Sequence, residues 1–153
     1  MSHIHEIGND FSVDVLVVCN NRVLIRLHEK YGIWIAVGGH IELDEDPNEA
    51  AVREVKEEVG LDVILYKKPD TVLVEDDRYK ELIPPTFLNI HKINDHHNHI
   101  SCIYFAKSNT IDVIPENPDD KWTWLTLEEV EKNEIGMDPN MQRYAKAALA
   151  VYQ

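Results

Sequence analysis

Three apolar runs between residues 11 and 37 predict β-strands. Residues 11–19 and 22–28 are rich in valine, leucine and isoleucine and flank Asn20-Asn21, a pair that tolerates positive φ. We expect two strands joined by a hairpin at these asparagines. Residues 33–37 form a third, shorter apolar run that leads directly to Gly38-Gly39.

Between residues 46 and 60 the apolar spacing changes to the helical period. Asp46 and Pro47 are suited to the N-cap and first helical position, Glu49 is placed to complete a capping box, and Gly60 is suited to a left-handed C-terminal cap. The apolar positions fall on one face: Ala51, Val52, Val55 and Val59. Three glutamates fall on another face about a third of a turn away: Glu54, Glu57 and Glu58.

The second half of the chain continues the mixture of strands and helices. The predicted strands are residues 63–68, 71–75, 86–93, 100–106 and 122–125, with a loop at 107–121. Thr126 and Glu129 form a capping-box pattern that begins a short helix, and Asp138-Pro139 begins an alanine-rich helix that runs to Val151. We therefore expect residues 1–153 to form a single α/β domain.

The three glutamates at positions 54, 57 and 58 predict a metal site. Carboxylates on one helical face repel each other by a few tenths of a kcal/mol per i,i+4 pair, and a divalent cation would relieve the repulsion. Mg2+ binds through one or two carboxylates and takes other ligands from water and substrate phosphates. The alternative interpretation is an ordinary solvated helix surface.

The spacing of residues 39–61 gives these glutamates a context. The pattern is G-x5-E-x7-R-E-U-x-E-E-x-G-U, where U is aliphatic, and its fixed positions are Gly39, Glu45, Arg53, Glu54, Glu57, Glu58 and Gly60. This segment resembles the signature of the Nudix hydrolases at every position, a match expected by accident about once per million chains of this length. The resemblance implies the Nudix fold, a mixed β-sheet sandwiched between α-helices. It also implies Mg2+ as the cofactor, with Mn2+ as a substitute.

The same resemblance implies roles for the individual residues. Glu57 and Glu58 are expected metal ligands together with the carbonyl of Gly38, and Glu54 is either a third ligand or the general base. Arg53 counts with the catalytic residues but is expected to act by supporting the site rather than by contacting phosphate. The residues that hold the loop and helix together are Gly39, Glu45 and Gly60.

Candidates for substrate contact lie outside the signature. Arg26 and His40 flank the approach to the glycines and are placed to meet phosphate, although an outward position on its strand is equally compatible with Arg26. The loop before Trp122 offers three further acids: Glu116, Asp119 and Asp120. Each of these is either a participant in catalysis or a solvated loop residue.

The net charge of −13 constrains the partners. An acidic cleft repels an anionic substrate unless cations intervene, so the charge favours metal dependence. No stripe of lysine and arginine is present, which argues against a nucleic-acid polymer as partner. A small nucleotide or nucleotide-like diphosphate is the expected ligand.

Four of the eight histidines crowd into one stretch and suggest a second kind of site. Imidazole suits zinc, copper and nickel, so a transition-metal site is one interpretation. The other is a polar hairpin turn, because the paired Cys/His spacing of zinc sites is not evident. The residues are His91, His96, His97 and His99.

Cysteine usage and the N-terminus favour the cytosol. Cys19 and Cys102 lie in apolar runs and are expected to be reduced core residues. The segment MSHIHEIGND lacks the basic and apolar regions of a signal peptide, and no apolar run is long enough to span a membrane. Dimers are common among similar proteins, so a homodimer is an open expectation.

The leading hypothesis is a Mg2+-dependent Nudix pyrophosphohydrolase that cleaves the diphosphate bond of a nucleoside diphosphate linked to another moiety, by attack of water at phosphorus. The alternative is a Nudix-fold module that binds a nucleotide without turnover. An isoprenyl diphosphate isomerase of the same fold is disfavoured by the short chain and by the lack of a suitably placed cysteine. The residues outside the signature identify no substrate subclass.

Overall fold

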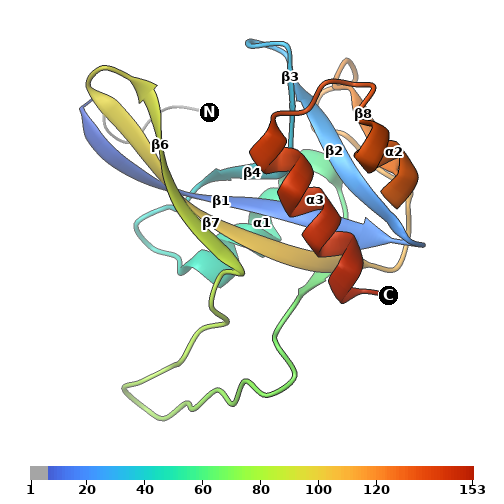
Figure 1. Ribbon diagram of the computed structural model, residues 1–153. Coiled ribbons are helices and arrows are strands. Elements are labelled where there is room, and N and C mark those ends of the chain that lie inside the picture. The colour runs from blue at the N-terminus through green and yellow to red at the C-terminus, as the bar shows by residue number, and fades with distance from the viewer. Residues whose placement is uncertain (1–6) are drawn as a thin grey trace.

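The computed structural model describes residues 7–153 and contains one mixed β-sheet with helices on its two faces (Figure 1). The elements in chain order are β1 (Gly8–Cys19), β2 (Arg22–His28), β3 (Ile33–Ile35), β4 (Val37–His40), α1 (Pro47–Val59), β5 (Val63–Leu65), β6 (Phe87–Asn94), β7 (His97–Ser108), β8 (Trp122–Leu125), α2 (Leu127–Lys132) and α3 (Pro139–Val151).

The long strands β1 and β7 form the centre of the sheet. They run parallel over their full length, with Asp10 opposite His99 and Leu16 opposite Phe105. The principal strand order is β3-β2-β1-β7-β5, and β4, β6 and β8 pair with β1, β7 and β2 respectively. The hairpin between β1 and β2 turns at two asparagines with positive φ, 50° at Asn20 and 59° at Asn21, as the sequence predicts.

The two faces of the sheet bury separate apolar clusters. On β1, Val13, Val15 and Val17 pack under α1, whereas Leu16 and Val18 pack under α3. In Figure 1 α3 lies in front of the sheet and α1 behind it. This alternation follows from the period of two along a strand, which sends neighbouring side chains to opposite faces. The predicted arrangement, a mixed sheet between helices, is confirmed.

Helix α1 has the predicted ends but a different buried face. The Asp46 carboxylate accepts a hydrogen bond from the Glu49 backbone N–H at 2.9 Å, and Gly60 ends the helix with φ of 70°. Val52, predicted to face the core, is 39% exposed, and the buried apolar positions are Ala50, Ala51, Val55 and Val59. The helix is therefore rotated so that it presses part of its acidic face against the sheet.

Two predicted strands differ from the structure. Residues 71–75 form no strand and contribute only an isolated bridge from Glu75 to Lys80, and the strand predicted at 63–68 ends at Leu65. Val72 and Val74 are exposed, so the apolar residues of this segment are not buried against a neighbouring strand. Figure 1 shows it as a long loop extending below the sheet.

The run predicted as one strand at 33–37 is divided at Ala36. β3 pairs with β2, whereas β4 turns to pair with β1, where Gly38 lies opposite Asp14. This change of partner brings the chain from the edge of the sheet to its centre. It also places the two glycines beside α1, with which β4 is in contact.

The remaining predictions concern the ends of the chain and its thiols. Thr126 and Glu129 form the predicted capping box, and the Asp138 side chain caps the N-terminus of α3. Cys19 and Cys102 are free thiols; the first is buried and the second half-buried. Within residues 7–153, no helix is both long and apolar enough to cross a membrane. Residues 1–6, which include most of the segment assessed for a signal peptide, lie outside the described part.

Candidate active site

Arg53 holds the loop before α1, α1 itself and β4 together. Its guanidinium donates to both carboxylate oxygens of Glu45, at 2.8 and 2.6 Å, and to the backbone carbonyl of His40 at 3.1 Å. It also donates to Glu54 at 3.1 Å and to Glu57 at 3.0 Å. The hydrogen bonds from Arg53 lower the pKa of Glu45, which therefore stays ionised. These contacts are those of a support for the acidic helix.

The three glutamates of α1 lie in different surroundings. Glu54 is 6% exposed and Glu58 5% exposed, whereas the Glu57 side chain is 55% exposed. Burial raises the pKa of Glu54, and it raises the pKa of Glu58 to about 8 against the opposing effect of Arg26. A buried carboxyl whose charge is disfavoured gains most from a nearby cation. Carboxylate oxygens are donors that a hard divalent ion prefers, and coordination of an ion by these three glutamates stays a prediction.

Gly38 lies against both β1 and α1. Its backbone N–H donates to Oε2 of Glu58 at 3.3 Å. A Cβ at this position would collide with the carbonyl oxygen of Val13 and would lie 2.8 Å from Oδ1 of Asp14. Only glycine allows the backbone to approach this closely. Coordination of a metal by the Gly38 carbonyl stays a prediction.

Arg26 connects Glu58 with the loop that precedes β8. Nη1 of Arg26 lies 3.6 Å from Oε2 of Glu58, and Nη2 lies 3.6 Å from Oδ1 of Asp120. Arg26 and Asp120 both line a cavity of about 250 Å³. The period of the sheet sends Arg26 to the face that carries α1, the same face as Leu24. Of the two interpretations of Arg26, the structure supports the one that faces the site.

The loop at residues 107–121 is attached to the C-terminal end of α1. The backbone N–H of Ile114 donates to the carbonyl of Val59 at 2.9 Å, and that of Glu116 donates to the carbonyl of Glu58 at 3.0 Å. Glu116 is exposed but close enough for its charge to raise the pKa of Glu58. Asp119 is exposed on the same loop. Glu116 and Asp120 are therefore brought to the glutamate turn, and Asp119 lies at the surface beside them.

His40 belongs to a different group from Arg26 and Glu58. Its ring is buried, with Nε2 3.4 Å from Oδ2 of Asp10 and 3.4 Å from Nε2 of His99. These ring contacts are with Asp10 and the histidine group, and a contact of His40 with phosphate stays a prediction. Its backbone carbonyl accepts a hydrogen bond from Arg53 of the glutamate helix.

Four residues that line this cavity are absent from the sequence prediction: His28, Glu29, Lys30 and Asn117. His28 and Asn117 line the cavity beside Arg26 and Asp120. Burial and the charge of Arg26 lower the pKa of His28, which keeps the ring neutral at pH 7. The signal that predicts His28 is its position two residues after Arg26, because such residues share one face of a strand.

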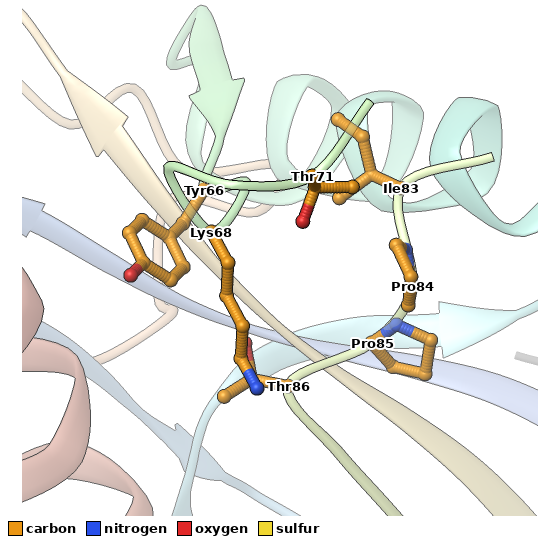
Figure 2. Close-up of a pocket in the computed structure, with 7 residues that line it drawn as sticks. All are labelled: Tyr66, Lys68, Thr71, Ile83, Pro84, Pro85 and Thr86. Carbon is orange, nitrogen blue, oxygen red and sulfur yellow. The ribbon is translucent and has the colours of Figure 1, made fainter. Parts of the chain in front are cut away.

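A second cavity, of about 100 Å³, has no glutamate in its lining (Figure 2). Its lining residues are Tyr66, Lys68, Thr71, Ile83, Pro84, Pro85 and Thr86. Asn48, near the start of α1, holds this segment through hydrogen bonds to both backbone groups of Ile83, at 2.9 and 2.8 Å. None of the predicted site residues lines this cavity.

An acidic helix held by an arginine on a mixed sheet, with Glu58 beside a cavity, is the arrangement that the sequence signature predicts for a hydrolase. The family comparison is more specific: the model of the NUDIX domain matches residues 8–147, so the chain belongs to the Nudix family. As a member of the Nudix hydrolases it is an enzyme that acts on phosphoric anhydride bonds.

Solved structures agree with this assignment. A hydrolase of the NUDIX family from Clostridium perfringens is 32% identical to this chain. The match covers 96% of this chain and 100% of that protein's chain, with a TM-score of 0.82. The MutT protein from Methanosarcina mazei Go1 is 17% identical over 97% of this chain and 99% of its own, with a TM-score of 0.69, and shows similarity of fold alone.

Curated relatives match shorter segments. An RNA pyrophosphohydrolase from Gluconacetobacter diazotrophicus is 49% identical over 41 residues, which are 26% of this chain and 25% of that relative. The m7GpppN-mRNA hydrolase NUDT17 from Danio rerio is 32% identical over 96 residues, which are 59% of this chain and 31% of that relative. The matches thus span between a quarter and a third of these relatives.

Proposed function

We propose that the protein is a Mg2+-dependent pyrophosphohydrolase that cleaves the diphosphate bond of a nucleoside diphosphate linked to another moiety. Nucleoside triphosphates and nucleotide sugars are substrates of this kind. The observation that carries the proposal is the position of Glu58. Its buried carboxyl lies 3.6 Å from Arg26, and Arg26 lines a cavity together with Asp120.

The proposed ligands of the metal are the carboxylates of Glu54, Glu57 and Glu58 and the carbonyl of Gly38. All are oxygen donors, which suit Mg2+ and also Mn2+. When bound, the ion neutralises charge on the phosphate oxygens and lowers the pKa of a bound water. The raised pKa values of Glu54 and Glu58 support this assignment, since an adjacent cation would stabilise both as anions.

The chain's own residues position the substrate and accept the proton. Arg26 donates to a phosphate oxygen at the mouth of the cavity, a contact suited to the planar guanidinium. Water attacks phosphorus, the anhydride P–O bond breaks, and the leaving phosphate departs with the bonding electron pair. A carboxylate takes the proton from the water; Glu54 and Glu116 are the candidates because both lie at the Glu58 turn.

The substrate that we propose is a small nucleotide rather than a polymer. The net charge of −13 opposes the approach of an extended polyanion. Two relatives carry names that refer to RNA, so the ends of RNA chains belong among the compounds tested. The free thiols of Cys19 and Cys102 are consistent with the cytoplasm as the compartment.

The test is a phosphate-release assay with Mg2+ over a panel of compounds: nucleoside triphosphates, nucleotide sugars, ADP-ribose, RNA with a 5′-triphosphate and capped RNA. We expect turnover of at least one small compound that stops when Mg2+ is chelated. Glu57→Gln is expected to lower kcat/KM about 100-fold or more with the melting temperature retained, because Glu57 is exposed. Glu49→Gln is the control, since Glu49 is an exposed acid on the same helix.

Two results would contradict the proposal. Tight binding of a nucleotide with no product would favour a binding module without turnover. Equal activity of Glu57→Gln and Glu49→Gln would remove the glutamate turn from the reaction. Faster turnover of 5′-triphosphate RNA than of any small compound would replace the proposed substrate class while retaining the chemistry.

A further inference from the structure

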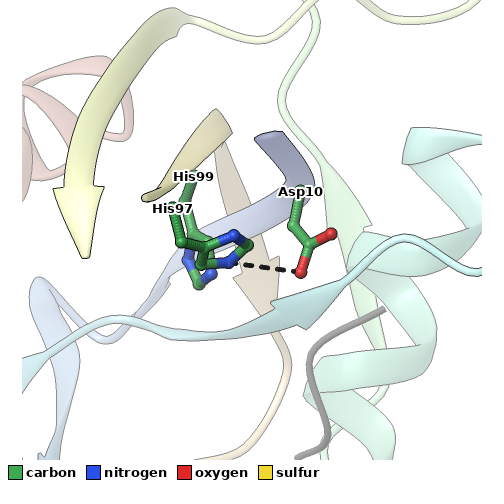
Figure 3. A group of neighbouring side chains, drawn as sticks. All are labelled: Asp10, His97 and His99. Atoms are coloured by element: carbon green, nitrogen blue, oxygen red, sulfur yellow. Dashed lines mark ion pairs between the residues drawn. The ribbon is translucent and has the colours of Figure 1, made fainter. Parts of the chain in front are cut away.

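Four side chains on the opposite face of the sheet from α1 form a compact buried group. Asp10 comes from β1, His40 from the end of β4, and His97 and His99 from the start of β7. The exposed fractions of the Asp10, His97 and His40 side chains are 0, 2 and 7%, and His99 is half-buried. Figure 3 shows both histidines of β7 directed towards the Asp10 carboxylate.

The spacing of the polar atoms fits a metal ion. Oδ2 of Asp10 lies 3.4 Å from Nε2 of His40 and 3.4 Å from Nε2 of His97, and the Nε2 atoms of His40 and His99 are also 3.4 Å apart. The ligand atoms of Asp10, His97 and His99 all lie within 4.8 Å of one another. His40 is outside that set of three and adjoins it at Asp10 and His99. Donors at the corners of a tetrahedron about 2.0–2.1 Å from a central zinc are separated by about 3.3–3.4 Å. The usual N–H···O hydrogen bond is shorter, at about 2.9–3.0 Å.

We propose that Asp10, His40, His97 and His99 bind one Zn2+ ion or a divalent transition metal of similar preference. Three imidazoles and one carboxylate suit zinc rather than Mg2+, which prefers an all-oxygen set. Four protein ligands leave no open position, as in structural zinc sites. The ion is therefore a structural element that joins β1, β4 and β7.

This site is separate from the glutamates of α1. Asp10 and His99 face each other in the β1–β7 register, on the face of β1 that also carries Leu16 and Val18. The glutamate helix packs on the other face. The carbonyl of His40, which accepts from Arg53, connects the two regions. The proposal is therefore independent of the proposed hydrolytic activity.

Only two histidines of the run in the sequence take part. His91 and His96 are exposed, and Nδ1 of His91 lies 2.9 Å from the side-chain oxygen of Asn89. His96 lies in the turn between β6 and β7. The run in the sequence is thus a hairpin whose second strand directs two imidazoles inward. The other two ligands come from positions distant in the chain.

The test uses the full chain without an affinity tag, stripped of metal and kept in excess Mg2+ so that oxygen sites are occupied. Titration with Co2+ is expected to give one equivalent of bound ion with the intense visible absorption of tetrahedral, nitrogen-ligated cobalt, and Zn2+ is expected to abolish that absorption. Zn2+ at a hundred times its Kd is expected to raise Tm by roughly 5–10 °C.

Variants connect the signal to these residues. His99→Gln and Asp10→Asn are expected to weaken Co2+ binding at least tenfold. His96→Ala, an exposed histidine of the same hairpin, is the matched control and is expected to bind as the unchanged protein does. Glu57→Gln is also expected to retain the signal, because the glutamate turn is not part of the site. Circular dichroism verifies that each variant is folded; the half-buried His99 makes its substitution the milder of the two.

The titration of the unchanged protein decides the proposal by itself. A folded protein that binds no Co2+ with tetrahedral absorption in excess Mg2+ would overturn it, and the four side chains would then form only a hydrogen-bonded and ionic network. Equal loss of binding in His96→Ala and His99→Gln would also overturn it, because the ion would then lie at the surface of the hairpin.

Discussion

The guanidinium of Arg53 holds both carboxylate oxygens of Glu45, with Nε 2.8 Å from Oε2 and Nη2 2.6 Å from Oε1. This two-point contact fixes the loop before α1 relative to the helix, because the planar fork of arginine matches a carboxylate in direction as well as charge. Contacts of the same side chain with the His40 carbonyl and with Glu54 extend the support to β4 and to the glutamate turn.

Arg53→Lys is expected to destabilise the protein. Lysine cannot reproduce the paired contact with Glu45, and the Arg53 side chain is only 24% exposed. Loss of charged hydrogen bonds of this kind costs roughly 1–3 kcal/mol of the free energy of unfolding. Urea denaturation measures this decrease in the free energy of unfolding. Lys56, on the same helix, forms an exposed pair with Asp62, and Lys56→Ala is expected to cost less than about 0.5 kcal/mol. Equal effects of the two substitutions would count against the support role of Arg53.

The pKa of Glu58 predicts a pH dependence of stability. Burial raises that pKa from 4.5 in the unfolded chain to about 8 in the folded state. Between these values the folded protein holds a proton that the unfolded chain has released, so stability decreases as pH rises. The contribution of Glu58 to the free energy of unfolding is complete below about pH 4.5 and is lost as pH approaches 8. Its size is on the order of a few kcal/mol.

Measurement of the free energy of unfolding from pH 5 to pH 8 without metal tests this prediction. Glu58→Gln does not titrate, so its stability is expected to decrease less over this range than that of the unchanged protein. Addition of Mg2+ is expected to reduce the slope of the unchanged protein, since a cation stabilises the carboxylate. Parallel curves for the two proteins would show that Glu58 titrates near its ordinary pKa.

The ends of α1 were predictable because they depend on local chemistry. Asp46 caps the helix and Gly60 takes φ of 70°. Which glutamate side chains are buried was not predictable to the same degree. Periodicity places Glu54, Glu57 and Glu58 on one face, but the helix rotates so that Glu54 and Glu58 are buried and Val52 is exposed. An apolar pattern cannot show that buried positions are polar, because it assigns every glutamate to solvent.

Long-range pairings account for most of the remaining differences. The change of partner between β3 and β4 depends on β1, whose residues are some twenty positions earlier in the chain. The group around Asp10 joins residues up to 89 positions apart, and a run of histidines in one hairpin gives only part of it. The predicted strand at 71–75 fails for the converse reason: its alternation is present, but no neighbouring strand buries Val72 or Val74.

Gly38→Ala is expected to reduce stability and activity together. The new Cβ would meet the backbone carbonyl of Val13, which cannot move without disturbing β1. Overpacking of this kind costs about 1–3 kcal/mol, and displacement of β4 would also move the N–H that donates to Glu58. Melting curves and kcat/KM are the measurements.

Gly32→Ala is the control for this glycine. Gly32 has φ of 61° and nothing within 4 Å of an added Cβ, so the substitution carries only the local strain of the left-handed backbone, about 1–2 kcal/mol. Its activity at a temperature where it is folded is expected to be unchanged. If the folded fraction of Gly38→Ala were fully active, close approach at Gly38 would have no role in the site.

Arg26→Gln is expected to weaken substrate binding more than it slows turnover. The Arg26 side chain is 18% exposed and lies 3.6 Å from both Glu58 and Asp120, too far for a tight hydrogen bond to either. Among the described residues no acceptor bonds its Nε. The guanidinium therefore keeps donors for a phosphate in the cavity that it lines. Loss of one such charged contact is expected to raise KM about tenfold, or about 1.4 kcal/mol, with kcat changed several-fold at most.

Steady-state kinetics with the best substrate of the panel distinguishes this role from a general effect of charge. Lys30→Gln removes the same charge from the same cavity at an exposed position. Its KM is expected to change less than threefold, because salt screens an exposed charge more strongly than a buried one. Equal increases in KM for the two variants would indicate long-range attraction rather than contact. A large decrease in kcat with constant KM for Arg26→Gln would instead show that Arg26 acts in the transition state, through the charge on the phosphoryl oxygens.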